Sequence, residues 1–306
     1  MRVAVVDIGT NSTRLLVADV ADGRVSQLER RSTVTRLGRG VDTSGQLAGE
    51  AVEEVCRTVG EYIEAYQSLG VERVTAIATS AVRDAANSGA FLAELRERFA
   101  LDARILEGAE EARLVYLGAF TERPAADSTL VVDIGGGSTE VVVGSGGDIG
   151  FHTSLQAGTV RHTERYLRTD PPAPGELEEL ASDVRSLIDA ELAGEAIAAA
   201  SEGIAVAGTP TSLAAIDQEL DPYDPERVHG YRLPLESVQR MCSMLSSKPL
   251  EERLQVTGLH PGRAPTIVAG VVILIQVMRA FGLKEIEVSE HDILYGAALE
   301  GARAPA

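Results

Sequence analysis

Cysteines and long apolar runs are scarce in this sequence of 306 residues, and each shortage excludes a class of protein. The two cysteines, Cys56 and Cys242, lie far apart and have no metal-ligand spacing. This argues against a disulfide framework or a zinc site and favours a reducing, cytoplasmic compartment. The longest apolar stretch, 267–278, is shorter than the roughly 20 residues that a membrane span requires, so it predicts a buried helix. The chain enters a predicted strand at once, and we therefore expect no signal peptide.

Positive charge is also scarce. The sequence has 28 Lys and Arg residues against 46 Asp and Glu residues, a formal net charge of −18. Such a charge repels polyanions at long range, so we expect no nucleic-acid partner. Lys248 and Lys284 are the only lysines. Arginine suits bidentate phosphate contact, although a GC-rich coding sequence would give the same bias. A phosphate ligand would therefore need a local group of arginines.

Several familiar catalytic signatures are missing. The sequence has no Walker loop, no dinucleotide fingerprint, no Gly-x-Ser-x-Gly and no His-Glu-x-x-His. Its five histidines share no ligand spacing. The sequence instead contains one short pattern twice: VVDIGTNSTR at 5–14 and VVDIGGGSTE at 131–140. Each copy predicts a strand that ends in Asp-Ile-Gly, a tight turn, and a second strand.

The repeated turn has the chemistry of a phosphate-binding loop. Glycine allows the backbone to approach an anion closely, and backbone N–H groups and hydroxyls bind phosphate oxygens. An ordinary hairpin would explain one copy alone, whereas two matched copies favour a duplicated architecture. The candidate phosphate-binding residues are Gly9, Thr10, Asn11, Ser12 and Arg14 in the first copy, and Gly135, Gly136, Gly137, Ser138 and Thr139 in the second.

Three carboxylates in these repeats are candidate ligands of Mg²⁺. Asp7 and Asp133 stand at equivalent strand ends, where a hard oxygen ligand would meet the cation or its bound water. Glu140 is the counterpart of Arg14, so one copy supplies a cation where the other supplies a carboxylate. A solvated strand residue is the alternative for Glu140.

A predicted helix at 107–120 begins with Glu110 and Glu111. One of them would act as a general base for an attacking water, and helical spacing prevents both from pointing into one site. Simple stabilisation of the helix N-terminus is the alternative for both.

Two further turns could hold phosphate. Arg83 follows a strand together with Ser80, and an ion pair with Asp84 or a neighbouring Glu is its alternative role. Gly208 and Thr209 open a helix after a predicted strand, and a helix N-terminus presents free N–H groups to an anion.

The order of predicted elements indicates an α/β fold in two halves with a cleft between them. Length alone favours two domains, and we expect boundaries at 1–124 and 125–292, with a linker within 121–128. A proline-rich spacer is expected at 170–175. The other expected elements are helices at 52–66, 91–99 and 176–192, strands at 73–78 and 103–106, and a strand, turn and helix at 205–213.

Six ordered stretches resemble the exopolyphosphatase and guanosine pentaphosphate phosphohydrolase (Ppx/GppA) family. They span almost the whole chain, at 7–12, 78–84, 108–114, 133–140, 207–211 and 289–296. The resemblance implies two domains of the actin-like, ribonuclease H-like fold, also called the ASKHA superfamily. It also implies that the C-terminal helix at 293–306 packs on the first domain. Longer members carry further helical domains, so the sequence resembles a short form without an HD-like domain.

The resemblance also implies an activity, the Mg²⁺-dependent release of terminal orthophosphate from inorganic polyphosphate. It assigns Glu111 as the general base, Asp133 and Glu140 as metal-directed carboxylates, and Arg83 as a phosphate ligand. Hydrolysis of pppGpp is the near alternative. A small kinase of the same fold and a non-catalytic nucleotide-binding or filament protein are more distant alternatives. No membrane partner is expected, and the sequence does not specify the oligomeric state, for which a homodimer is one option.

Overall fold

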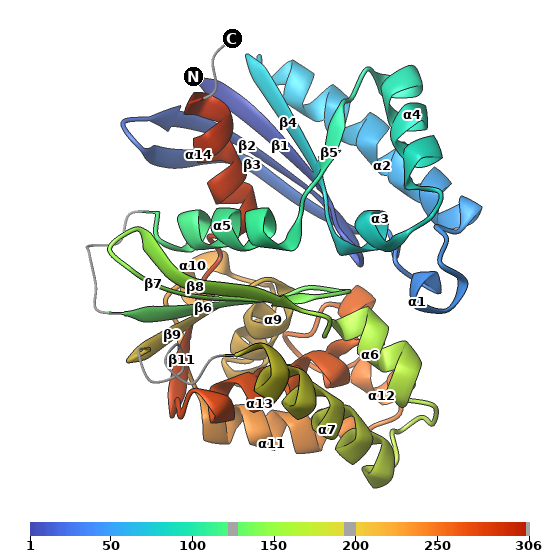
Figure 1. Ribbon diagram of the computed structural model, residues 1–306, viewed down its shortest axis with the longest axis vertical. Coiled ribbons are helices and arrows are strands. Elements are labelled where there is room, and N and C mark those ends of the chain that lie inside the picture. The colour runs from blue at the N-terminus through green and yellow to red at the C-terminus, as the bar shows by residue number, and fades with distance from the viewer. Residues whose placement is uncertain (122–127, 193–199, 304–306) are drawn as a thin grey trace. The chain divides into compact units, whose positions relative to one another are not determined.

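Two separate sheets form the framework of the protein in a computed structural model, which describes residues 1–121, 128–192 and 200–303 (Figure 1). The chain divides into unit 1, Met1–Glu122 with Ile293–Ala306, and unit 2, Arg123–Asp292. The expected linker falls mainly on 122–127, which lie outside the described residues. The predicted α/β class is confirmed in both units.

The sheet of unit 1 has the strand order β3-β2-β1-β4-β5. Its first three strands form an antiparallel meander, whereas β4 and β5 run parallel to β1. The strands are β1 (Arg2–Ile8), β2 (Ser12–Ala21), β3 (Arg24–Val34), β4 (Arg73–Ala78) and β5 (Ala103–Ile105). The predicted strand at 73–78 is therefore confirmed in full.

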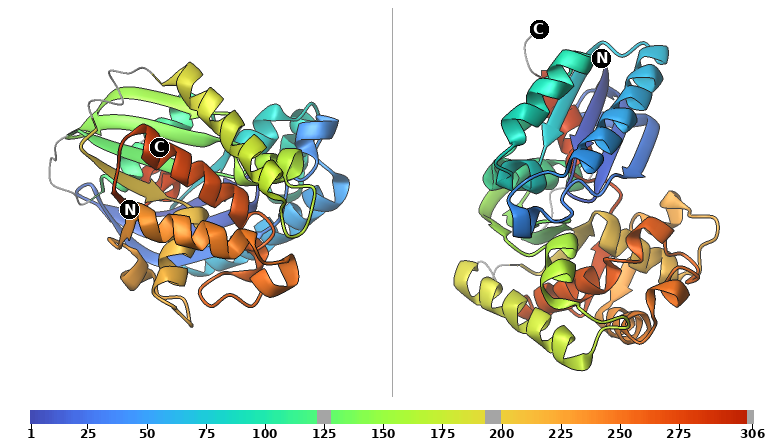
Figure 2. Two further views of the ribbon diagram at one scale, coloured as in Figure 1. Left: turned by 90° about the horizontal axis from the view of Figure 1, so that it is seen from below. Right: turned by 90° about the vertical axis from the view of Figure 1, so that its right-hand side faces the viewer.

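Helices cover both faces of this sheet because alternate residues of β1 are apolar on both sides. Ala4 and Val6 pack with residues of α2, whereas α14 contacts β1, β2 and β4 (Figures 1 and 2). Gly296 of α14 comes so close to α5 that an added Cβ would lie 1.9 Å from the Leu114 carbonyl oxygen. The helices are α1 (Val41–Ser44), α2 (Gly49–Ser68), α3 (Ser80–Asp84), α4 (Ser88–Phe99), α5 (Gly108–Ala119) and α14 (Ile293–Arg303).

The sheet of unit 2 repeats this topology and adds one short strand. Its order is β10-β11-β9-β6-β7-β8, in which β6, β7 and β8 form the meander and β9 and β11 run parallel to β6 and to each other. The strands are β6 (Thr129–Ile134), β7 (Thr139–Ser145), β8 (Asp148–Leu155), β9 (Glu202–Val206), β10 (Arg232–Pro234) and β11 (Glu285–Val288). Both predicted hairpins are thus confirmed, and each begins the sheet of its unit.

The core of unit 2 is centred on α13, the helix predicted from the apolar stretch at 267–278. It contacts α6, α7, α9, α11 and β6, and burial of each of its Val, Ile and Leu side chains contributes about 1.5–3 kcal/mol. The helices are α6 (Thr159–Tyr166), α7 (Pro174–Glu191), α9 (Gly208–Asp217), α10 (Pro225–Val228), α11 (Leu235–Ser246), α12 (Leu250–Arg253), α13 (Ile267–Ala280) and a 3₁₀ turn η1 (Pro261–Arg263).

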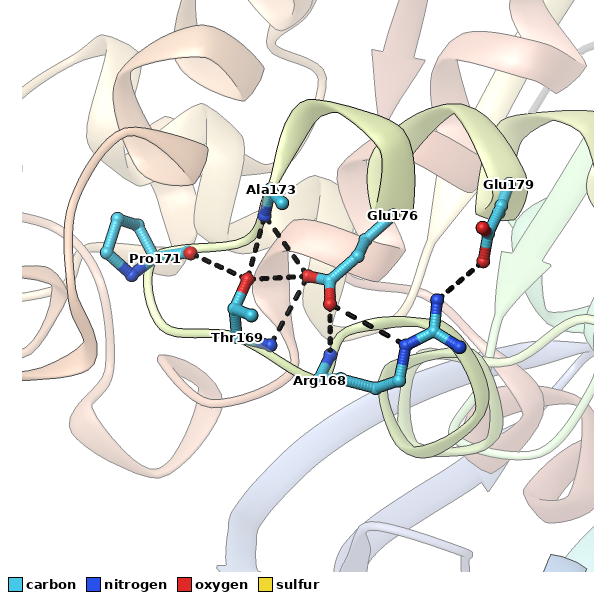
Figure 3. Close-up of polar contacts among 6 residues, drawn as sticks. All are labelled: Arg168, Thr169, Pro171, Ala173, Glu176 and Glu179. Carbon is cyan, nitrogen blue, oxygen red and sulfur yellow. Dashed lines mark hydrogen bonds and ion pairs between the residues drawn. The ribbon is translucent and has the colours of Figure 1, made fainter.

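The Glu176 carboxylate ties the proline-rich segment before α7 to the start of that helix. Glu176 accepts hydrogen bonds from the backbone N–H groups of Arg168, Thr169 and Ala173 and from the Thr169 hydroxyl (Figure 3). Burial opposes ionisation of Glu176, but these hydrogen bonds outweigh it and lower the pKa of the carboxyl. These bonds tie the segment to the first turn of α7, and its role as a spacer stays a prediction.

Candidate functional site

Each hairpin loop closes with the same hydrogen bond. In unit 1 the Gly9 N–H donates to the Ser12 carbonyl at 3.1 Å, and in unit 2 the Gly135 N–H donates to the Ser138 carbonyl at 3.0 Å. A Cβ at Gly9 would lie 2.8 Å from the Ser12 oxygen, so only glycine fits this turn without a shift. The repeated Gly and Ser of the sequence therefore build the same turn twice.

In unit 1 the loop carbonyls point toward the segment that follows β3. The Thr10 carbonyl accepts from Gly38 N–H at 2.8 Å, and the Asn11 carbonyl accepts from Thr35 N–H at 3.1 Å. In a trans peptide the N–H of the next residue points the opposite way from the carbonyl. The N–H groups of Asn11 and Ser12 are thereby directed away from this segment.

In unit 2 the backing segment is the start of α6. The Gly135 carbonyl accepts from Thr159 N–H at 2.9 Å, and the Gly136 carbonyl accepts from Val160 N–H at 2.8 Å. The Arg161 side chain donates through Nε to the Gly137 carbonyl at 2.7 Å. Since three successive carbonyls are held on one side, the following N–H groups point to the other side, which is the arrangement of an anion-binding nest.

The hydroxyl groups of the two loops have different surroundings. Thr139 is fully buried and donates to the Ala157 carbonyl at 2.6 Å, so its hydroxyl holds the loop to the segment after β8. Thr10 Oγ1 accepts from the Ala81 N–H at 3.1 Å and thereby joins the loop to α3. Ser12 is 8% exposed, and its Oγ has no hydrogen-bond partner among the described residues. Ser138, at the equivalent position, is 2% exposed.

The aspartates that end β1 and β6 face different partners. Arg14 donates to one oxygen of Asp7 from Nε at 2.8 Å and from Nη2 at 2.6 Å. Asp7 and Arg14 are direct cross-strand partners, as are Asp133 and Glu140 in the other hairpin. Asp133 is 7% exposed and Glu140 is 1% exposed. The first hairpin thus carries a buried ion pair where the second carries two carboxylates.

Glu140 has one further support. Ser154 of β8, its partner on the other side, donates to Glu140 Oε1 at 2.8 Å. This bond fixes the carboxylate group. Asp133 and Glu140 together offer hard oxygen donors of the type that Mg²⁺ prefers, and the donor set therefore fits the predicted cation. No group of three or more His, Cys, Asp and Glu side chains with metal-binding geometry occurs among the described residues. The remaining ligands would have to be substrate oxygens and water.

The two glutamates of α5 point to different partners. Glu110 pairs with Arg104 of β5 near the surface, whereas Glu111 is 7% exposed and accepts from Arg83 Nη1 at 3.0 Å. Arg83 is itself fixed, because the same Nη1 donates to the Leu106 carbonyl at 2.7 Å. The geometry thus separates Glu111 from Glu110, although the helical pattern of the sequence left both open.

The residues of unit 1 meet because three parallel strands end at the same edge of the sheet. β1 leads into the Gly9 loop, β4 into α3, and β5 into α5. The Thr79 N–H donates to the Ile8 carbonyl at 3.3 Å, and the Leu106 N–H donates to the Ala78 carbonyl at 2.9 Å. The carboxyl ends of parallel strands are the usual location of binding sites in α/β proteins. Ser80, at the start of α3, is 2% exposed, and its hydroxyl lies 3.4 Å from Asp84.

Arg263, which the sequence did not single out, lies against the Gly208 turn at the end of β9. A Cβ on Gly208 would lie 1.5 Å from Arg263 Nη1, so the guanidinium lies directly against this glycine at the start of α9. Ala207, one residue earlier, has φ of 72°, a conformation that costs a non-glycine residue about 1–3 kcal/mol. Thr209 is 4% exposed, and its side chain packs against Gly270 of α13. The turn thus places a positive charge beside the first residue of α9.

None of the helices in the described part of the chain is both long and apolar enough to cross a membrane.

Comparison with known proteins gives consistent matches over nearly the full length. Residues 16–300 match the model of the Ppx/GppA phosphatase family. Exopolyphosphatase 2 of Mycobacterium tuberculosis is 36% identical over 312 residues, which cover 97% of this chain and 98% of that protein. A solved exopolyphosphatase-like protein is 32% identical with a TM-score of 0.93, covering 99% of this chain and 98% of its own. The Aquifex aeolicus family member is 31% identical with a TM-score of 0.83, covering 99% and 97%.

Proposed function

We propose that this chain, which belongs to the Ppx/GppA phosphatase family, is an exopolyphosphatase. Its family and the geometry of its two loops support this function. The reaction is Mg²⁺-dependent hydrolysis of the terminal phosphate of inorganic polyphosphate. The observation that carries the proposal is the duplicated loop, whose carbonyls are held from behind so that its N–H groups face the other way. Phosphate oxygens need such preorganised donors.

Unit 1 supplies the group that activates water in this proposal. Glu111 accepts the proton of a water molecule that attacks the terminal phosphorus, and the bond from that phosphorus to the bridging oxygen breaks. The products are orthophosphate and a chain shorter by one phosphate. Arg83 donates to Glu111 and so fixes the orientation of its carboxylate. Arg83 also brings positive charge to the phosphate-binding edge of unit 1.

The two loops and the α9 turn bind the phosphate groups. In unit 1 these are the backbone N–H groups of Asn11 and Ser12, and in unit 2 those of Gly136 to Ser138. Arg263 beside Gly208 adds the local positive charge that a chain of net charge −18 requires. Thr139 and Thr10 hold their loops through hydrogen bonds to protein atoms.

Asp133 and Glu140 would hold the Mg²⁺ ion, which when bound neutralises charge on the phosphate oxygens. Asp7 fits this role less well, because the guanidinium of Arg14 already bonds to one of its carboxylate oxygens. The proposal places the reaction in the cytoplasm, in keeping with two cysteines that are free in the structure.

Hydrolysis of the terminal 5'-phosphate of pppGpp is the second candidate function, because the same loops and the same base would act on that substrate. The experiment is a comparison of orthophosphate release from short polyphosphate, long polyphosphate, pppGpp and ATP, each with Mg²⁺ and with EDTA. We expect the highest kcat/KM with polyphosphate and no release in EDTA. Preference for pppGpp would transfer the assignment to the second candidate. ADP formation that depends on an added sugar would indicate a kinase, and ATP-dependent sedimentation without turnover would indicate a filament protein.

A further inference from the structure

His162 of α6 is fully buried in unit 2, and the mechanism above does not use it. Its Nε2 lies 3.1 Å from Asp183 Oδ2 of α7, and its Nδ1 accepts from the backbone N–H of Gly158 at 3.4 Å. The ring also contacts that of Tyr166 one turn later, with centroids 5.5 Å apart. Both nitrogens of the buried ring are therefore engaged, and the Asp183 side chain on its outer side is 31% exposed.

This pair of contacts requires one protonation state. Nδ1 can accept from Gly158 only through its lone pair, so the ring proton is on Nε2 and donates to Asp183. Burial lowers the pKa of His162 to about 4 and outweighs the opposing effect of Asp183, while Arg165 and Arg161 lower it by smaller amounts. The ring is thus neutral near pH 7, as the contact with Gly158 needs.

Gly158 connects this histidine to the phosphate loop. A Cβ on Gly158 would lie 2.4 Å from the Gly136 carbonyl oxygen, so the two backbones are in direct contact. The next two N–H groups, of Thr159 and Val160, donate to the Gly135 and Gly136 carbonyls. A shift of Gly158 would therefore move the carbonyls that set the direction of the loop N–H groups.

We propose that His162 is a positioning residue that holds the unit 2 phosphate loop through Gly158, with Asp183 fixing the imidazole. The proposed phosphate binding rests on the function argued above, whereas the mechanical link rests on the contacts alone. The equivalent backing segment of unit 1 holds its loop through the N–H groups of Thr35, Arg36 and Gly38. Unit 1 contains no histidine, so its loop serves as an internal reference.

Two substitutions each keep one hydrogen bond of the ring and remove the other. In His162→Asn, the side-chain oxygen occupies the position of Nδ1 and still accepts from Gly158. In His162→Gln, the amide reaches the position of Nε2 and still donates to Asp183 but leaves the Gly158 N–H unpaired. The unpaired Gly158 N–H destabilises the contact between Gly158 and the loop, so the loop should open about ten times more often.

The measurement is hydrogen exchange of peptides covering 134–140 and 8–14 in the full chain, together with KM and kcat for polyphosphate. We expect His162→Gln to speed exchange about tenfold in 134–140 only and to raise KM about tenfold. We expect His162→Asn to stay within about threefold of the parent protein in both readouts. If His162→Gln does not fold, Asp183→Ala is measured instead. It should speed hydrogen exchange in 134–140 about threefold.

Three results would overturn the proposal: unchanged exchange in 134–140, equal changes in both peptides, or a smaller yield of active protein with an unchanged KM. The last result would mean that His162 only stabilises the fold. The exchange readout does not need turnover, so absence of polyphosphate hydrolysis by the parent protein would reject the proposed function and leave the link testable.

Discussion

Arg14 and Asp7 form a buried ion pair across the first hairpin, with two donor nitrogens at 2.8 and 2.6 Å from the same carboxylate oxygen. The second hairpin has Glu140 at the position of Arg14, directly opposite Asp133. A duplicated element has thereby acquired two chemistries. One copy neutralises its aspartate internally, and the other presents two carboxylates suited to a cation.

Removal of Arg14 should destabilise the protein. The Arg14 and Asp7 side chains are only 16% and 2% exposed, so Arg14→Ala leaves a buried carboxylate without its main partner and should cost about 3 kcal/mol. Urea unfolding measures the loss. The matched control is Arg31→Ala, which removes a surface pair with Glu29 and should cost less than about 1 kcal/mol. Equal losses in the two variants would contradict a special role for the Asp7 pair.

Asp133 and Glu140 should determine the Mg²⁺ requirement. Asp133→Asn and Glu140→Gln each remove a charged oxygen ligand, so the Mg²⁺ concentration for half-maximal activity should rise about tenfold or more. A titration of activity with Mg²⁺ gives this value. Asp148→Asn, at an exposed position at the start of β8, is the control and should leave it unchanged. A Mg²⁺ dependence that is the same in all three variants would remove the metal assignment.

Substrate affinity should depend on the Arg263 guanidinium. Gly208→Ala places a methyl group where Nη1 lies, and because that atom is the end of a flexible side chain, the protein should fold with the guanidinium displaced. We expect KM for polyphosphate to rise about tenfold, since one charged contact is lost. Gly49→Ala, whose new Cβ would meet nothing within 4 Å, should behave like the parent. A normal KM for Gly208→Ala would show that Arg263 does not bind substrate.

Acid should remove the stabilisation that Glu176 provides. Its pKa is lowered in the folded protein, because hydrogen bonds from Thr169, Ala173 and Arg168 outweigh the opposing effect of burial. Its contribution is therefore present above the pKa of the unfolded chain, about 4.3, and is lost as the pH falls through the lower folded pKa. Glu176→Gln should melt below the parent at pH 7, and the gap should narrow below about pH 4. Glu178→Gln, an exposed surface residue, is the control. A gap that does not change with pH would be inconsistent with this account.

Local patterns were enough to predict the framework. The two hairpins follow from apolar runs that end in Asp-Ile-Gly, and α13 follows from its continuous apolar stretch. Predictions that needed distant partners were less complete. Asn87 stands at the N-cap position of α4, yet its side chain bonds to the backbone N–H and carbonyl of Leu47, forty residues away, and not to the helix.

Contacts with residues that are distant in the sequence also decide which side chains belong to the candidate site. The spacing of Glu110 and Glu111 shows only that they diverge, whereas their roles differ because Arg104 and Arg83 lie on different sides of α5. Arg263 gives no signal near Gly208 in the sequence, because 55 positions separate them and no periodic pattern joins them. Such pairs are decided by tertiary packing, which neither propensity nor motif spacing contains.

The most direct test of the central claim is kcat for polyphosphate in Glu111→Gln and Glu110→Gln. Both changes remove one charge from adjacent positions of α5, but only Glu111 is buried beside Arg83. The account predicts a fall of about 100-fold or more in kcat for Glu111→Gln, with polyphosphate still bound, and a value within about twofold of the parent for Glu110→Gln. Similar kcat values in the two variants would contradict it.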